Sequence, residues 1–241
     1  MSGYVYEGKK TGGGELRKAI CGKNSPIYLT NDPGNVPSVR TLWGEGLEFT
    51  NRWLVELNFG LWGLSSLGAD FRMFIFNFMQ GKLYLNNVVA RFDNIEPTCT
   101  FCVIKAKKEL LERGILMGMP EYNYYLNLLP VESADHLFWD CSTTILVIQQ
   151  CYRWVRGFDW YNGVEEMEKY EFLIGMESEE KSIVKVDVIW KHFVRYFIYK
   201  CKRNKRVPYF PSLKYELEGL FKNPGMQKMT HHFQFINVLY L

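Results

Sequence analysis

Four side chains in the middle of the sequence have the types and spacing of a zinc-binding site. Cys99 and Cys102 are separated by two residues, a spacing that lets both thiols reach one ion from a tight turn. His136 and Cys141 add an imidazole and a third thiol. Three thiolates and one imidazole are the ligands of a closed, tetrahedral structural zinc site. The sequence therefore predicts one zinc ion that stabilises the fold and has no open position for chemistry.

The separation of the two pairs leaves another interpretation open. Between Cys102 and His136 lie 33 residues, more than most zinc fingers use, although the entropy of loop closure grows only with the logarithm of length. The alternative is that the four side chains are unrelated buried residues. Cys21, Cys151 and Cys201 have no partner at metal-ligand spacing, and we expect the last two to be core residues.

Charge is distributed unevenly along the chain, although the net charge is only +3. Residues 165–180 carry seven acidic side chains, and residues 181–206 carry nine basic ones. A basic stripe of this kind is typical of surfaces that bind polyanions. Two solvated faces that balance each other would have the same composition, so the charge pattern alone does not decide between them.

Motifs for other chemistry fail in this sequence. Gly22-Lys23 is not part of a phosphate loop, because Arg17 stands where that motif needs glycine and Asn24 where it needs Ser or Thr. No Asp-Asp pair occurs that could help to hold the two metal ions of a polymerase. We therefore expect a protein that is not an enzyme.

The composition predicts a folded, soluble, intracellular protein. Of its 241 residues, 47% are hydrophobic and 16% aromatic, enough for a substantial core. Met1 is followed by no apolar signal segment, and no apolar run reaches the roughly 18 residues that a membrane-spanning helix needs. Inside the cell, close cysteine pairs bind metal more often than they form disulfides.

Helical periodicity dominates the elements that must position these residues, and no strand-like alternation occurs. Apolar residues three and four positions apart predict helices over 67–78, 85–92, 145–155 and 182–206, with a shorter one over 105–113. Pro208 and Pro211 are expected to stop the long helix. We expect a mostly α-helical domain organised around a Cys3His zinc knuckle, with little or no β-sheet.

Five segments follow from this pattern. They are a loosely structured leader (1–40), a helical segment (41–98), the zinc-binding segment with an inserted loop (99–141), a helical segment with the basic final helix (142–206) and a C-terminal tail (207–241).

The order of these motifs resembles the zinc-binding C-terminal region of reverse transcriptases from non-LTR retrotransposons of the long-interspersed-element type. That region has an aromatic-rich helix, Gly-x-Leu, a second helix, Cys-x2-Cys, an acidic residue and a His-Leu-aromatic-aromatic-x-Cys box. The matching residues here are Phe74–Phe78, Gly81–Leu83, Ala90–Phe92, Cys99–Cys102, Glu132 and His136–Cys141. Downstream, Tyr196–Lys202 is similar to a further run of the family that precedes a proline. The likeness covers about residues 65–215 and is most specific at the His136–Cys141 box.

The resemblance implies a non-catalytic module that binds RNA or DNA, with zinc as a structural cofactor, and the sequence has no polymerase motif beside it. Phosphate contacts are then expected from the basic residues of the last long helix, which are Lys191, Arg195, Lys200, Lys202, Arg203, Lys205 and Arg206. The spacer between the ligand pairs is longer than in the family, and residues 121–130 look like an inserted loop. The alternative is a structural or protein-interaction module that uses the same amphipathic helix against an acidic protein surface or against residues 165–180.

Overall fold

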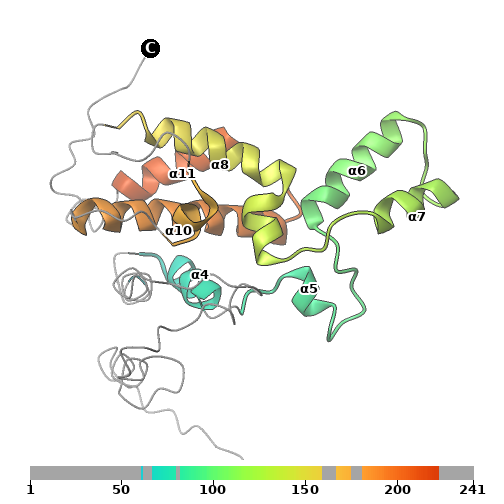
Figure 1. Cartoon of the computed structure of the whole chain (residues 1–241), viewed down its shortest axis with the longest axis horizontal. Coiled ribbons are helices and arrows are strands. Elements are labelled where there is room, and N and C mark those ends of the chain that lie inside the picture. The colour runs from blue at the N-terminus through green and yellow to red at the C-terminus, as the bar shows by residue number, and fades with distance from the viewer. Residues whose placement is uncertain (1–60, 62–66, 80–81, 159–166, 175–180, 223–241) are drawn as a thin grey trace, which may run out of the picture. The chain divides into compact units, whose positions relative to one another are not determined.

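A computed structural model describes residues 61, 67–79, 82–158, 167–174 and 181–222, all in the second of the chain's two units, Trp53–Leu241. These residues form helices and contain no β-strand, only one isolated antiparallel bridge between Thr98 and Val131. The prediction of a mostly α-helical fold without a sheet is therefore confirmed for this part of the chain (Figure 1). The expected leader at 1–40, most of 41–66, the acidic residues of 175–180 and the end of the tail at 223–241 lie outside the described residues.

Helices account for most of the described residues. In chain order they are α4 (Ala69–Met79), α5 (Asn86–Val89), α6 (Thr100–Glu112), α7 (Pro120–Asn127), the π-helix η1 (His136–Asp140), α8 (Ser142–Val155), α9 (Lys169–Ile174), α10 (Lys181–Arg203) and α11 (Phe210–Lys222).

The long helix α10 packs against α4, α9 and α11, and α11 in turn packs against α8, which lies beside it in Figure 1. From Val186 to Arg195 every residue of α10 is buried. A helix that is buried on all sides in its middle is a core element rather than a surface helix with one wet face. This position of α10 decides which of its basic residues are accessible.

An aromatic cluster joins α4 to α10 and to η1. The apolar face predicted for α4 is confirmed, since Phe71, Phe74 and Phe78 are buried. The ring of Phe71 lies 5.3 Å from that of Phe193 in α10, and the ring of Phe78 lies 5.6 Å from that of Phe138 in η1. Because η1 carries one predicted metal ligand and borders another, this cluster fixes half of the candidate site against the core.

The structure corrects several boundaries. The stretch 121–130, expected as an inserted loop, contains α7, and the segment 207–241, expected as a tail, contains α11 with Leu213, Leu217 and Phe221 buried. The expected helix over 85–92 is only the short α5, and Phe92 is exposed. None of the helices in the described ranges has the length and apolarity needed to cross a membrane.

Candidate metal centre

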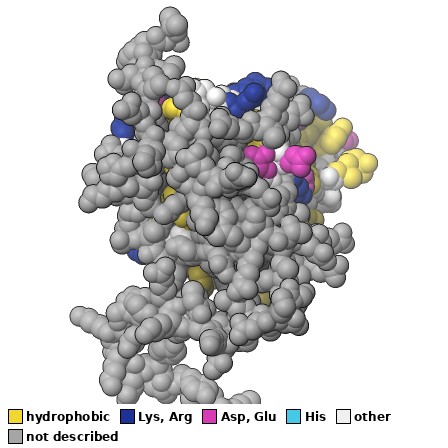
Figure 2. Space-filling view, turned by 60° about the vertical axis from the view of Figure 1, so that its left-hand side comes forward, with side chains coloured by type: hydrophobic (Ala, Val, Ile, Leu, Met, Phe, Trp, Pro, Cys, Tyr) yellow, Lys and Arg dark blue, Asp and Glu magenta, His cyan; other side chains and the backbone are white. Residues whose placement is uncertain are grey.

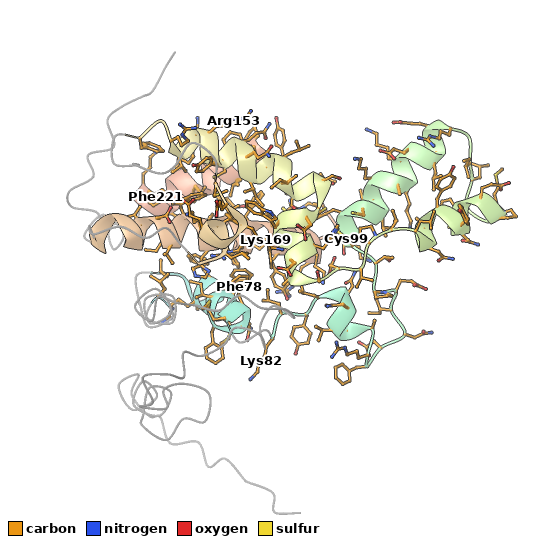
Figure 3. All side chains as sticks on the ribbon, viewed as in Figure 1. Phe78, Lys82, Cys99, Arg153, Lys169 and Phe221 are labelled. Atoms are coloured by element: carbon orange, nitrogen blue, oxygen red, sulfur yellow. The ribbon has the colours of Figure 1, made fainter. Side chains whose placement is uncertain are left out.

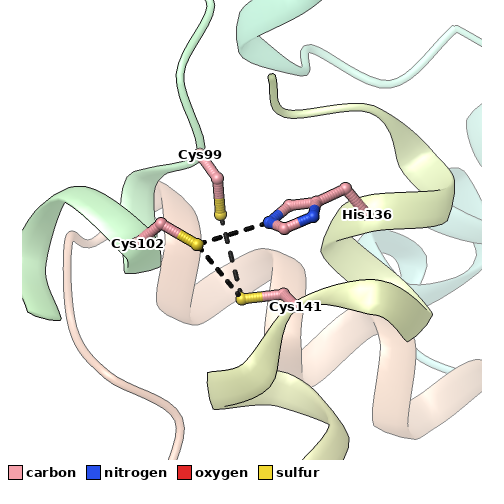
Figure 4. A group of neighbouring side chains, drawn as sticks. All are labelled: Cys99, Cys102, His136 and Cys141. Atoms are coloured by element: carbon pink, nitrogen blue, oxygen red, sulfur yellow. Dashed lines mark hydrogen bonds between the residues drawn. The ribbon is translucent and has the colours of Figure 1, made fainter. Parts of the chain in front are cut away.

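The four predicted ligands converge on one point, as Figure 4 shows. The Sγ atom of Cys141 lies 3.9 Å from the Sγ atom of Cys99 and 3.9 Å from that of Cys102. The Nε2 atom of His136 lies 3.4 Å from Cys102 Sγ. All four donor atoms lie within 4.8 Å of one another, so the predicted grouping of these side chains is confirmed.

These distances are those of ligands around a small tetrahedral ion. With zinc–sulfur bonds of about 2.3 Å, two sulfurs of a regular tetrahedron lie about 3.8 Å apart, and a sulfur and an imidazole nitrogen lie slightly closer together. The sulfur–sulfur separations of 3.9 Å and the nitrogen–sulfur separation of 3.4 Å match this geometry. A hydrogen-bonded group of thiols needs no such regular arrangement. The donor set and the spacing therefore fit a metal ion with four protein ligands.

Helix α6 presents the first pair. Cys99 is the N-cap residue of α6 with an extended backbone, and Cys102 lies in its first turn. The Cys99 N–H donates to the carbonyl of Pro130, which holds the chain before α6 beside the chain that leaves α7. This contact explains how 33 intervening residues can return to the site: they form a helical hairpin whose two ends meet.

The π-helix η1 presents the second pair. Residues five positions apart point in different directions on an α-helix, because each residue turns the chain by about 100°. In η1 the N–H of Cys141 donates to the carbonyl of His136 at 2.7 Å, an i→i+5 bond that brings the two residues almost into line. A π-turn of this kind is rare and often marks a functional position. Because of this π-turn, the side chains of His136 and Cys141 lie on the same side of the helix and reach the same site.

The thiols and the imidazole polarise one another strongly. Hydrogen bonds from Cys102 and Cys99 lower the pKa of Cys141, whereas hydrogen bonds to Cys102 and Cys141 raise the pKa of Cys99. The pKa of His136 is raised to about 9, first by its hydrogen bond with Cys102 and then by that with Cys141. A metal ion that binds these donor atoms displaces their protons, so metal binding depends on pH.

Two helix N-termini face the site. Cys99 is the N-cap residue of α6 and Cys141 is the N-cap residue of α8. Three thiolates exceed the charge of a divalent ion by one unit, and the positive end of a helix dipole stabilises such an excess. Both caps lack a side-chain hydrogen bond to the helix, so their sulfurs remain available as ligands.

Glu132 ties this segment to the rest of the fold. It is fully buried, and its carboxylate accepts hydrogen bonds from the backbone N–H groups of Asn86 and Thr100, each at 2.9 Å. The Nζ atom of Lys202 lies 3.1 Å from the same carboxylate and also donates to the carbonyl of Tyr84. Glu132 therefore joins the start of α5, the start of α6 and the end of α10.

Helix α9 is attached to η1 on the other side of the site. Lys169, which Figure 3 labels, pairs with Asp135 at 3.3 Å and with Asp140 at 3.7 Å. These acidic residues directly precede His136 and Cys141. The ring of Trp139 lies 5.7 Å from that of Phe172 in α9. These contacts attach α9 to η1, and α9 also packs against α10.

Two of the seven predicted nucleic-acid contacts are buried, and the prediction that they point outward is wrong. Lys191 lies 2.7 Å from Asp187 and 3.1 Å from Glu171, and it is fully buried. Arg195 is also fully buried: its guanidinium lies 4.4 Å from the centre of the Phe78 ring and donates to the carbonyl of Leu173. Burial lowers the pKa of Arg195 to about 9. These cations are part of the core and cannot reach phosphates.

The other five residues predicted to contact nucleic acid differ in how far they are exposed. Lys202 is paired with Glu132, and Lys200 lies 2.8 Å from Glu216 with about a third of its side chain exposed. Arg203, Lys205 and Arg206, at the end of α10, are exposed. Figure 2 shows a few Lys and Arg side chains among the grey atoms of the residues that are not described. Of the basic stripe expected along α10, the exposed part is its basic end, which consists of Arg203, Lys205 and Arg206.

Sequence reasoning missed Glu132 as a structural centre, although it is the acidic residue of the family pattern. A buried carboxylate that binds two helix starts has no distinctive spacing. The chain matches no protein-family model, and no curated protein and no solved structure is significantly similar to it. The resemblance to the reverse transcriptase region therefore depends on the motifs quoted above.

Proposed function

We propose that this chain is a non-catalytic module in which one structural zinc ion stabilises a helical fold that binds nucleic acid. The observation that carries the proposal is the convergence of three thiols and one imidazole from α6 and η1 at ligand–ligand distances that fit zinc. Four protein ligands fill a tetrahedral shell, and zinc sites of that kind stabilise structure.

The chain's own residues determine what the ion would do. Zinc, when bound, supplies a cross-link between Cys99 and Cys102 at the start of α6 and His136 and Cys141 around η1. Because the unfolded chain has no preformed site, the binding free energy of the metal becomes folding free energy. Zinc is favoured over harder ions by the three soft thiolates.

The nucleic-acid part of the proposal is supported by the basic end of α10 and by the family resemblance. Arg203, Lys205 and Arg206 are exposed and close together in the sequence, and the structure records no ion pair for them among the described residues. Cations of this kind bind phosphates without reading the bases, so the expected binding is largely independent of sequence.

Metal analysis and a titration test the two halves separately. The purified chain should contain about one zinc per molecule, and a well-folded chain without metal would contradict the first half. A labelled RNA or DNA oligonucleotide should bind with a dissociation constant of roughly 10⁻⁴ to 10⁻⁶ M at physiological salt. Affinity should fall steeply as salt rises, and a chain that binds nothing even at low salt would contradict the second half.

Two charge-reversal variants test whether the basic end of α10 is the surface that binds nucleic acid. Changing Arg203, Lys205 and Arg206 to Glu should weaken binding to every sequence and flatten the salt dependence. Changing the exposed Arg113, Arg153 and Lys222 to Glu alters the net charge equally at other places and should have a smaller effect. Equal effects of the two variants would mean that net charge rather than this surface governs binding.

One observation favours protein interaction as a second function. The α6–α7 hairpin exposes large apolar side chains, among them Met117 at 81%, Leu111 at 65% and Tyr124 at 63%. Exposed apolar groups that gather on one element often mark an interaction surface. The apolar face of α10, by contrast, is packed inside the fold. Protein interaction becomes the leading function if the oligonucleotide titration fails.

A further inference from the structure

A cavity of about 680 Å³ lies beside the metal segment and belongs to neither the metal site nor the buried core. Its walls come from the chain before α6, from α6 and α7, and from the turn after α10. That volume lies within the range of about 300 to 1,000 Å³ that is usual for small-molecule sites. The hairpin between the two ligand pairs (Figure 1) therefore builds one wall of a possible binding site.

Aliphatic side chains of α6 and α7 line the cavity, and α7 also contributes amides. Val103 and Ile104 of α6 and Leu126 of α7 line it with half-buried aliphatic side chains. Asn123 and Asn127, four residues apart on α7, lie on the same face of that helix and also line the cavity. An aliphatic wall suits the flat face of a nucleobase, and amide side chains suit the hydrogen-bonding edge of a base.

Two cations from distant parts of the sequence border the same cavity. Lys107 comes from α6 and Lys205 from the turn after α10, and both are exposed. The structure records no ion pair for either lysine within the described ranges, whereas Lys105 and Lys108 on the same helix pair with Glu109 and Glu112. Unpaired lysines at the edge of a cavity suit phosphate groups.

The backbone of Lys205 strengthens this argument. Its φ is +50°, in the left-handed region, and it is the only non-glycine residue with positive φ among those described. The N–H of Arg206 donates to the carbonyl of Cys201, so Lys205 occupies the helix-ending position that glycine normally takes. Strain retained at such a position points to a use for the side chain.

We infer that this cavity binds one unpaired nucleotide, with the base against Val103, Ile104 and Leu126 and the phosphates at Lys107 and Lys205. The single acidic side chain of the lining, Glu96, can accept hydrogen bonds from an amino group of the base or from a ribose hydroxyl. A base within a duplex is stacked and paired, so the site selects single strands or free nucleotides. This inference rests on the proposed function and names the part of the nucleic acid that is recognised.

The test uses the full zinc-loaded chain with a labelled 12-nucleotide single strand, the matching duplex, and AMP, GMP, CMP and UMP as competitors. The single strand should bind more tightly than the duplex. Lys107→Gln should weaken single-strand binding roughly tenfold, as expected for the loss of a charged hydrogen bond. It should also lower the slope of log affinity against log salt by about 0.7.

Two further variants separate the cavity from general charge. Replacing Asn123 and Asn127 by Ala should weaken binding without changing the salt slope, because no charge is removed. Lys108→Gln removes the same charge from the same helix outside the cavity and should change affinity less than about twofold. Both amides and both lysines lie on the surface, so these changes should leave the fold intact.

Each outcome has one meaning. Oligonucleotide binding that responds to the basic end of α10 but not to the cavity variants overturns this inference and leaves the proposed function standing. Equal affinity for single strand and duplex overturns it as well. If no oligonucleotide binds but a mononucleotide does, and Lys107→Gln weakens that binding, the ligand is a free nucleotide and the proposed function fails. If nothing binds, both fail.

Discussion

The cysteines that the structure describes lie in two kinds of environment, and the environment decides what each thiol contributes. Cys99, Cys102 and Cys141 lie together with His136, whereas Cys151 is fully buried in α8 and burial raises the pKa of its thiol. A thiol kept neutral in an apolar setting behaves as a small hydrophobic group. A thiol at a helix start, surrounded by other donors, can bind a metal ion that displaces the protons of the cluster.

Substitution of single cysteines should separate these environments. Cys102→Ser removes one of four ligands and should lower the free energy of unfolding by several kcal/mol, because loss of a metal is among the few single changes with such an effect. Cys151→Ser leaves a buried hydroxyl and should cost about 1–3 kcal/mol. Thermal unfolding in the presence of zinc measures both. Equal losses would show that the cluster does not hold a stabilising ion.

Lys205 offers a second test at the scale of one residue. Glycine takes a positive φ without steric cost, so Lys205→Gly should raise the free energy of unfolding by roughly 0.5–1 kcal/mol. The same change removes one of the cations that border the cavity, so oligonucleotide affinity should fall. Denaturation and anisotropy titrations measure the two effects. A stabilised variant with unchanged affinity would assign no binding role to this lysine.

The sequence was most informative about the individual residues of the candidate metal site. The spacing of Cys99, Cys102, His136 and Cys141 predicted their convergence, because few other arrangements explain two such pairs. It could not predict Glu132, whose partners come from α5, α6 and α10. A buried carboxylate becomes recognisable only when the distant donors that surround it are known.

Helices were predicted well where one apolar face meets the core and poorly where that condition fails. For α10 the apolar period was read as one buried face with basic residues opposite, but α9 covers that opposite side with Glu171 and the carbonyl of Leu173. The spacing of apolar residues indicates which side of a helix faces solvent only when the helix has an exposed side. Lys191 and Arg195 were therefore predicted to be exposed, although that side of α10 is buried.

Proline explains the two helices that were missed. Pro120 stands at the start of α7, and Pro211 is the second residue of α11. Proline is tolerated in the first turn of a helix, since its missing N–H would have no partner there. The sequence interpretation read 121–130 as a loop and Pro211 as a stop for the preceding helix, and it did not consider that a new helix can begin at either proline.

The α6–α7 hairpin can be tested as an element. Replacing residues 111–128 by a short Gly/Ser linker keeps the turn of α6 that carries Cys102 and the contact between Cys99 and Pro130. The chain should still bind one zinc, since shortening the loop changes its closure free energy by under about 1 kcal/mol. Binding to the single strand should be lost with the α7 wall. Elemental analysis and a titration measure the two results, and loss of zinc would show that the hairpin organises the ligands.

For the whole molecule, the metal segment lies at the junction of α5, α6, η1 and α8, so removal of zinc should unfold more than a local turn. A chelator should reduce the helical circular dichroism signal in one cooperative step, and added zinc should restore it. In the presence of zinc, stability should rise by about 1.4 kcal/mol for each tenfold increase in free ion above the dissociation constant. A chelated chain with unchanged unfolding temperature would limit the ion to a peripheral role.

The carboxylate of Glu132 has a consequence that extends beyond stability. It contacts Thr100 next to the candidate metal ligand Cys99, and it contacts Lys202 next to the exposed Arg203. If a ligand bound at the end of α10 shifts Lys202, this contact carries the shift to the start of α6, and thermodynamic reciprocity then requires that ligand and zinc to change each other's affinity by the same factor. Nucleic acid should then raise the affinity of the chain for zinc, and zinc should raise its affinity for nucleic acid by the same factor. Glu132→Gln keeps the shape of the side chain and removes its charge, so it should bring that factor towards one. In the unchanged chain, the affinity for a nucleic-acid strand would then depend on whether zinc is bound.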